Sequence, residues 1–239
     1  MTNKKVEVYA HYMTDKAIKI AKKFTATTNS RPMLNNVFFG KDGTAIATNS
    51  HIAVRMYGAH EYKEDLQFIT KQNILIRNEH GHELYPVMEK IFENEAEVEL
   101  VLEKEGAKTI VEMLKAIIKV GKVLRSGTVG GGFAVIMYKE KDSSDLIFVM
   151  GESMDSSVEF KISIDEEVKG KAFHVALTTD YLIKCLEAVI EYGTKNEVKI
   201  IIENQHTQVL IEGEGIKTVV LPRRNYSADE YFSGGSNEG

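Results

Sequence analysis

Residues 173–221 read FHVALTTDYLIKCLEAVIEYGTKNEVKIIIENQHTQVLIEGEGIKTVVL, and three kinds of pattern follow one another within them. Alternating apolar residues at the start predict a strand at 173–175. A Thr-Thr-Asp sequence suited to capping then precedes a helix predicted over 179–192, whose apolar residues recur at helical spacing. Alternating β-branched residues predict three further strands, near 197–203, 207–212 and 216–221. The stretch therefore predicts a β-α-β-β-β unit.

The same order of patterns occurs twice upstream, so the fold is expected to contain internal repeats. The middle copy has a strand at 98–100, a helix over 107–124 and then three strands, near 133–138, 146–150 and 157–164. The first copy has a strand at 6–8, a helix over 13–26 and then three strands, near 33–39, 44–48 and 52–57.

A shorter fourth copy begins with a strand predicted over 66–70. Residues 70–73 resemble the helix cap at 178–180, but no helix of normal length fits before Pro86. We therefore expect an α+β protein of two domains followed by a tail. These parts are a reduced N-terminal domain at 1–95, a C-terminal domain of two full units at 96–224, and a flexible Gly/Ser/acid-rich tail at 225–239.

The composition is that of an ordinary folded protein from a reducing compartment. The 239 residues are 43% apolar and 27% charged, and no stretch has the ~18 apolar residues that a membrane helix needs. Cys185 is the single cysteine, which excludes an internal disulfide and fits the cytoplasm. The net charge of −5 argues against a protein that coats DNA over its whole surface.

Positive charge is concentrated in two of the predicted helices. Residues 12–28 carry a net charge of +3 and residues 107–125 carry +4, so the remaining chain carries −12. The third helix lacks this excess because Lys184 is accompanied by Glu187 and Glu191. Two interpretations stay open: solvated helix faces, or a surface that presents cations to phosphates without reading bases. The basic residues concerned are Lys16, Lys19, Lys23, Lys115, Lys119, Lys122 and Arg125.

No catalytic motif is recognised in the sequence. The glycine-rich run at 127–132 follows a helix and precedes a strand, the reverse of the order in a phosphate-binding loop, so a plain loop is predicted. Residues 79–83 read EHGHE, but nothing else has metal-like spacing, which favours a polar turn. Cys185 is expected to pack in the core. The sequence thus favours a binding protein over an enzyme and implies no cofactor or metal.

Two segments together resemble a known family. Residues 31–55 read RPMLNNVFFGKDGTAIATNSHIAVR, and residues 218–224 read TVVLPRR. They resemble the middle domain and the C-terminal end of the bacterial DNA polymerase III beta subunit, the sliding clamp. Residues 84–91, with Leu-Tyr-Pro followed by Ile, are similar to the segment that leads into the third domain of that family. The resemblance covers most of residues 5–224 and suggests a compact two-domain version lacking one domain.

The resemblance implies a DNA-clamp fold: pseudo-twofold β-α-β-β-β repeats with helices on the inner face around duplex DNA and sheets outside. It implies a DNA polymerase processivity factor that binds DNA without sequence preference, and binds peptides of polymerases and clamp loaders in an apolar pocket. By the same resemblance the pocket residues are Leu34, Thr48, Ser50, His51, Ile52, Val219, Val220, Leu221 and Pro222. Six domains close such a ring, which favours a homotrimer of this chain.

The sequence also departs from the family, and other functions stay open. The pocket segment is one residue short, because Ile52 stands where the family has two residues, and weaker binding of standard clamp peptides is expected. A clamp-fold adaptor could capture replication peptides without encircling DNA. A third alternative is an unrelated α+β enzyme that binds a small molecule. For the last strand, 219–221, simple burial in the core is an alternative to a pocket role.

Overall fold

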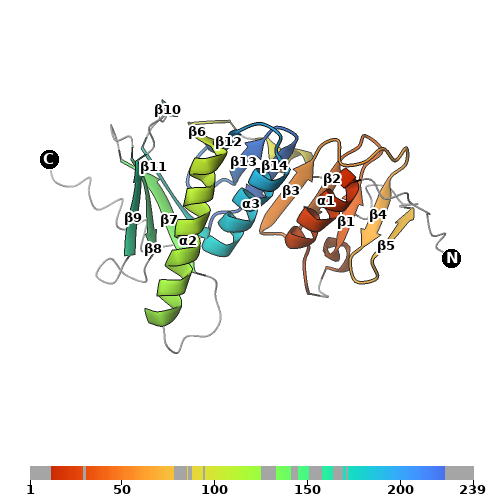
Figure 1. Ribbon diagram of the computed structural model, residues 1–239, viewed down its shortest axis with the longest axis horizontal. Coiled ribbons are helices and arrows are strands. Elements are labelled where there is room, and N and C mark those ends of the chain that lie inside the picture. The colour runs from red at the N-terminus through yellow and green to blue at the C-terminus, as the bar shows by residue number, and fades with distance from the viewer. Residues whose placement is uncertain are drawn as a thin grey trace.

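The computed structural model describes residues 12–28, 31–77, 85, 88–93, 95–124, 133–140, 145–150, 158–163, 169–170 and 172–223. Several predicted features lie outside the described residues: the strand at 6–8, the polar turn at 79–83, the glycine-rich run at 127–132, Arg125 and the tail at 225–239. Figure 1 shows helices α1, α3 and α2 in a row, with one sheet behind them and a second sheet beside α2.

The C-terminal part contains two complete units that exchange their first strands. The first unit comprises β6 (Val98–Glu103), α2 (Lys104–Leu124), β7 (Ala134–Lys139), β8 (Asp145–Met150) and β9 (Val158–Ser163). The short β10 (Lys169–Gly170) precedes the second unit, which comprises β11 (Phe173–Thr178), α3 (Thr179–Tyr192), β12 (Glu197–Ile202), β13 (Val209–Gly213) and β14 (Ile216–Val220). Strand β6 pairs antiparallel with β12, and β11 pairs antiparallel with β7. This exchange gives the pseudo-twofold arrangement of β-α-β-β-β units that the resemblance implies.

The N-terminal part contains one unit and an additional hairpin. Helix α1 (Tyr12–Ala21) continues into the 3-10 turn η1 (Lys22–Phe24), and a second turn η2 (Pro32–Asn35) leads into three strands, β1 (Asn36–Phe39), β2 (Ala45–Thr48) and β3 (Ile52–Met56). Strand β4 (Leu66–Ile69) pairs antiparallel with β1, as β11 pairs with β7. The predicted fourth opening strand is therefore present, but β5 (Ile74–Arg77) follows it where the other units have a helix.

Residues 70–73 resemble a helix cap in sequence, but they do not cap a helix in the structure. These residues form the turn between β4 and β5, and Asn73 adopts a φ of +55° within it. Asparagine tolerates this left-handed conformation better than most residues, so the same polar sequence suits a turn as well as a cap. The α-helix predicted over 13–26 is also shorter, because the chain tightens into η1 after Ala21.

One ten-stranded sheet connects the two parts of the chain. Its strand order is β10-β6-β12-β13-β14-β3-β2-β1-β4-β5, and a separate four-stranded sheet has the order β11-β7-β8-β9. The two parts join where β14 pairs antiparallel with β3, with Val219 opposite Ala53. The expected domain boundary near residue 95 is therefore crossed by a continuous ladder of backbone hydrogen bonds.

The ten-stranded sheet buries apolar side chains on both of its faces. On the face toward the helices, Val37 and Phe39 belong to one large core cluster with Phe24 of η1 and Leu114 of α2. Because side chains alternate along a strand, Phe38 points to the other face. There it forms a second, smaller cluster, whose further members are Ile46, Ala53, Tyr85, Met88, Phe92, Leu210 and Val219.

The second cluster explains how the connector between the two parts is held. Tyr85 stacks on Phe38 with ring centroids 5.7 Å apart, and its hydroxyl donates to the backbone carbonyl of Ile46. Phe92 ends the 3-10 turn η4 (Glu89–Phe92) and is buried. The connector thereby lies across the outer face of the sheet near the β3–β14 junction. Among the described residues, no helix combines the length and apolarity needed to span a membrane.

Candidate peptide pocket and lysine-bearing helix face

The turn between β2 and β3 is shaped by its own polar side chains. The Asn49 side-chain oxygen accepts hydrogen bonds from the backbone N–H groups of His51 and Ile52, both at 2.9 Å. The Thr48 hydroxyl donates to the carbonyl of Ile52 at 2.8 Å and accepts from the N–H of Ser50 at 3.1 Å. Ser50 has a φ of +78°. These bonds satisfy the backbone inside the turn and fix the directions of the flanking side chains.

The end of β14 is attached to this turn. The backbone N–H of Leu221 donates to the carbonyl of His51 at 2.9 Å, one residue beyond the Val220–Ile52 pair of the ladder. The Leu221 side chain is 42% exposed, whereas Val219 is 1% exposed. Val219 in β14 and Leu221 directly after the strand therefore contribute one buried and one exposed apolar side chain beside the turn.

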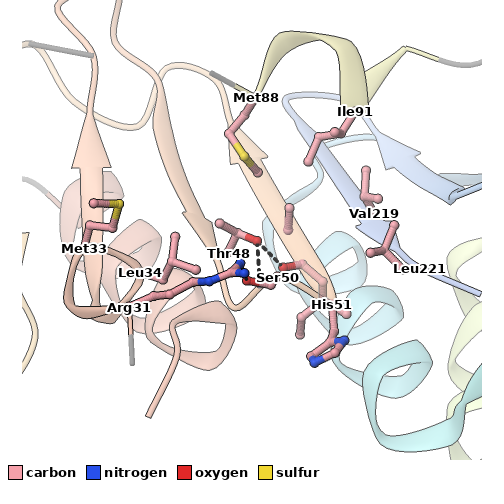
Figure 2. A pocket seen from close by; sticks show the side chains of 12 residues that line it. Arg31, Met33, Leu34, Thr48, Ser50, His51, Met88, Ile91, Val219 and Leu221 are labelled. Carbon is pink, nitrogen blue, oxygen red and sulfur yellow. Dashed lines mark hydrogen bonds between the residues drawn. The ribbon is translucent and has the colours of Figure 1, made fainter. Parts of the chain in front are cut away.

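These segments surround a pocket of about 440 Å³ at the junction of the two parts. Figure 2 shows side chains from η2, the β2–β3 turn, η4 and the end of β14 converging on it. Most of its walls are aliphatic or thioether groups. The lining residues are Arg31, Met33, Leu34, Thr48, Ser50, His51, Ile52, Ala53, Met88, Ile91, Val219 and Leu221.

The structure brings together most of the residues that the resemblance implied for the pocket. Those that line it are Leu34, Thr48, Ser50, His51, Ile52, Val219 and Leu221. Val220 does not, because it points into the main core with no exposed surface, and Pro222 also lies outside the lining. Val219 and Val220 are thus both buried in core clusters, although Val219 also borders the pocket, while exposed Leu221 stands at the mouth.

Five residues that line the pocket were not predicted from the sequence. Arg31 and Met33 lie beside Leu34 in η2 and its cap, and Ala53 follows Ile52, so they accompany predicted residues in the sequence. Met88 and Ile91 come from the connector around η4. The Tyr-Pro segment at 85–86 signalled that this connector resembles the family, but no pattern in it indicates which face of the sheet it covers.

Polar groups occupy one edge of the pocket. The Arg31 guanidinium donates to the Ser50 hydroxyl at 3.0 Å (Figure 2). The His51 ring stacks on Tyr181 of α3, with centroids 5.7 Å apart and planes 16° from parallel. The Lys184 ammonium lies 5.8 Å from the centroid of the same tyrosine ring. The pocket therefore has an apolar interior and a polar edge, where Arg31 supplies a positive charge and His51 contacts the first turn of α3.

The described lysines predicted to face DNA lie on α1 with the adjoining turn η1 and on α2, and these two helices flank α3 (Figure 1). Lys19 is exposed on α1, and Lys115 and Lys119 are exposed on α2. Lys16 and Lys23 are partly exposed, with the Lys16 ammonium 5.4 Å from the ring centroid of Tyr192. For Lys122 only the backbone, within α2, is described. We call these three helices and their exposed side chains the helix face.

Carboxylates of α3 pair with lysines on both neighbours. Glu191 lies 3.2 Å from the ammonium of Lys19 and 3.4 Å from that of Lys23. Glu187 lies 2.6 Å from the ammonium of Lys115 on α2. Partial burial raises the pKa of Glu191, but hydrogen bonds and positive charge from Lys19 and Lys23 outweigh it, so the pKa is lower than usual. The carboxylate is therefore ionised at neutral pH.

A metal centre and a reactive cysteine are two kinds of site that the described residues do not offer. The described residues contain no group of three or more His, Cys, Asp or Glu side chains placed to hold a metal ion. Cys185 is buried, and burial raises the pKa of its thiol to about 12, so it is not a nucleophile near neutral pH. Its predicted role in core packing is confirmed.

The fold is that of the sliding clamps of bacterial DNA polymerase III. The Bacillus subtilis clamp superposes with a TM-score of 0.68 at 14% identity, over 95% of this chain and 67% of that chain. The beta subunit of Streptococcus pyogenes gives a TM-score of 0.69 at 15% identity, over 94% and 68%. A Helicobacter pylori beta clamp bound to a DNA ligase peptide gives 0.64 at 15% identity, over 94% and 67%.

The chain thus spans about two thirds of the length of these clamps, as a compact version of the fold would. The sequence by itself matches no protein-family profile and no curated protein. The likeness to clamps is therefore carried by the three-dimensional arrangement, together with the short motifs at 31–55 and 218–224.

Proposed function

We propose that this protein is a cytoplasmic DNA sliding clamp that encircles duplex DNA and holds replication proteins through the junction pocket. The observation that carries the proposal is the joint occurrence, on a clamp fold, of this pocket and of lysines on the helix face. Neither feature requires chemistry, so the proposed protein is a processivity factor and not an enzyme.

The helix face suits contact with the DNA backbone. Its cations are lysines on exposed helix surfaces, and lysine acts as a point charge that attracts phosphate without selecting a base. Such contacts are independent of sequence and weaken as salt concentration rises. A protein that surrounds duplex DNA with this face would therefore be attracted to the duplex at every position along the DNA.

The junction pocket suits a short peptide with apolar anchors. Leu34, Val219 and Met88 provide buried walls that can receive leucine- or phenylalanine-sized side chains. Arg31 at the edge favours a partner peptide that carries an acidic residue next to its anchors. Ile52 is 1% exposed and forms part of the floor where the family has an additional residue. Affinity for standard clamp peptides is expected to be weaker for this reason.

The ends of the sheets suggest how copies would join in a ring. Strand β5 ends the ten-stranded sheet, and β9 and β11 end the four-stranded one. The edge of β11 is partly occupied, because the N–H of Arg223 donates to the carbonyl of Ala176 at 2.7 Å. We infer that β9 of one copy lies beside β5 of the next, so that edges exposed in one chain are covered in the ring. A homotrimer remains the predicted assembly.

Encirclement is tested by retention on DNA whose ends are blocked. A duplex is tethered to a bead at one end, incubated with protein, capped at its free end with a bulky protein, and washed in salt. We expect retention at salt concentrations that abolish electrostatic binding, and release when the DNA is cut. Solution mass should be three times the 26.8 kDa of one chain. Loss in the wash with or without the cap would overturn encirclement.

One observation favours the adaptor alternative. Three lysines of the helix face are already paired with glutamates of α3, which lowers the positive charge available to DNA. An adaptor would bind the same peptides in the junction pocket as a monomer, and salt alone would remove it from the capped DNA. The bead experiment and the mass measurement therefore separate the two functions.

A further inference from the structure

The pairing between α3 and its neighbouring helices follows from the spacing of its two carboxylates. Glu187 and Glu191 are four residues apart and therefore lie one turn apart on the same side of the helix. Glu187 reaches Lys115 of α2, while Glu191 reaches Lys19 and Lys23 on the side of α1. Both carboxylates are about one-third exposed, at 31%. They thus stand within the cationic helix face and in contact with solvent.

We propose that Glu187 and Glu191 limit the attraction of the helix face for DNA by competing with phosphates for its lysines. The inference rests on the proposed DNA-binding function. It assigns to α3 a role that the lysine helices do not have: α3 sets how strongly the clamp is held by the duplex that it surrounds.

The charge balance supports this role. Lys19, Lys23 and Lys115 carry three positive charges, and the two carboxylates reduce the local sum to one. For a phosphate to take one of these lysines, the lysine must leave a carboxylate that already lies at 2.6–3.4 Å. Part of the gain from each phosphate contact is therefore offset by the loss of an ion pair.

Stability of the fold is a poor alternative explanation for these pairs. Exposed ion pairs contribute little to the free energy of unfolding. The Lys19 side chain is 72% exposed and that of Lys115 is 50% exposed, so solvent screens both. The helices are instead held by the apolar core, in which Leu114 of α2 and Leu186 of α3 have no exposed surface. Removing the two carboxylates should therefore leave the fold intact.

The chain offers a matched control on the opposite face of the sheet. Glu99 lies 3.3 Å from the ammonium of Lys199, and Glu212 lies 3.2 Å from that of Lys217. Glu99 alternates with the core residues Val98 and Leu100, so it points away from the helices. The double variant E99Q/E212Q removes two carboxylates from ion pairs, as E187Q/E191Q does, but leaves the helix face unchanged.

The experiment measures binding of a fluorescent duplex by anisotropy across a series of salt concentrations. For E187Q/E191Q we expect affinity to rise about tenfold or more at low salt, and the slope of log K against log[salt] to steepen by up to about 2. The single variants E187Q and E191Q should each give part of this change. E99Q/E212Q should match wild type within about twofold, since its charges face away from the bound duplex.

Two results overturn the inference in distinguishable ways. If wild type binds DNA and E187Q/E191Q behaves like the control, α3 has no such role, while the proposed function stands. If neither wild type nor any variant binds duplex DNA at low salt, the proposed function fails and the inference fails with it. Melting temperatures of all variants, measured in the same buffers, confirm that the comparison is between folded proteins.

Discussion

The junction pocket and the helix face are both surfaces, but they are built from different kinds of residue. The pocket is lined by side chains such as Leu34 and Val219, which are 4% and 1% exposed and also belong to the packed interior. The helix face consists of charged side chains such as Lys19 and Lys115, of which half or more is exposed. Changes at the buried walls of the pocket should therefore affect folding and binding together, whereas changes on the helix face should affect binding alone.

The strongest test of this difference is a truncation at the base of the pocket. Leu34→Ala removes a buried side chain and should lower the free energy of unfolding by about 2–5 kcal/mol, because the space is refilled only in part. Urea denaturation measures this change. Leu34→Met keeps the volume and should cost less than about 1.5 kcal/mol. Equal stability of wild type and Leu34→Ala would show that the pocket wall is not part of the core.

The next effect concerns the helix face. Reversing Lys19, Lys115 and Lys119 to Glu should lower DNA affinity at low salt on the order of a hundredfold and reduce the salt slope by nearly 3, at about 0.9 per phosphate contact. Anisotropy titrations against a duplex measure both quantities. The melting temperature should change little, because exposed charges contribute little to stability.

A matched reversal of lysines outside the predicted DNA-facing set completes that test. The control variant changes three other lysines to Glu, namely Lys195, Lys199 and Lys217. It alters the net charge by the same amount, so an equal loss of DNA affinity in both variants would mean that total charge matters and the helix face does not.

A smaller effect is expected at the mouth of the pocket. Leu221 is 42% exposed, so Leu221→Ala should leave the melting temperature nearly unchanged. If Leu221 contacts an anchor of the bound peptide, the variant should lose about 1–3 kcal/mol of binding free energy. Calorimetry with a peptide carrying Leu and Phe anchors measures this loss. A lower melting temperature with normal peptide affinity would assign Leu221 to the core instead.

The smallest effect should arise from His60, which lies outside both surfaces. Its Nε2 hydrogen-bonds the carbonyl of Thr44 at 3.0 Å, and its Nδ1 accepts from the N–H of Tyr62 at 3.1 Å, which requires the neutral ring. Burial lowers the pKa of His60 below its usual 6.5, although the carbonyl of Thr44 and the charge of Asp42 partly oppose this.

The sign of the pH effect follows from that shift. The unfolded chain takes up the proton first, so the stability contributed by neutral His60 is present above about pH 6.5 and declines as the pH falls below it. Thermal melts between pH 5 and 8, with His60→Gln as the control, should show a decline that the variant lacks. Equal pH profiles for the two proteins would contradict the assignment.

Local features of the fold could be predicted from the sequence because their causes are local. The helix at Thr179–Tyr192 and the strand at Glu197–Ile202 follow from periodicity and capping, and the structure places them within a residue of the expected limits. The hairpin strand β5 was missed because 70–73 is compatible with either a cap or a turn. The turn forms instead of a cap because the free edge of β4 can pair with a following strand, and a single sequence does not reveal that edge.

In both the pocket and the helix face, some features could be predicted from the sequence and others could not. Thr48 to Ile52 could be identified because they form one continuous motif, whereas Met88 reaches the pocket only because the connector crosses the outer face of the sheet. The lysine stripes were visible as an excess of charge. Their pairing with Glu187 and Glu191 was not, since the place of α3 between α1 and α2 results from the order of strands in the sheet.

The pairing of β3 with β14 also governs how the chain must fold as it is synthesised. One edge of β3 (Ile52–Met56) pairs with β2, but its other edge pairs only with Ile216–Val220, so that edge stays unpaired while roughly 160 residues are added. At about 5–20 residues per second, this interval lasts roughly 8–32 s. An unpaired edge of mostly buried, apolar residues is a template for association with other chains. Because the ten-stranded sheet is completed only after β14 has been synthesised, the nascent edge of β3 needs protection until then, for example by a chaperone.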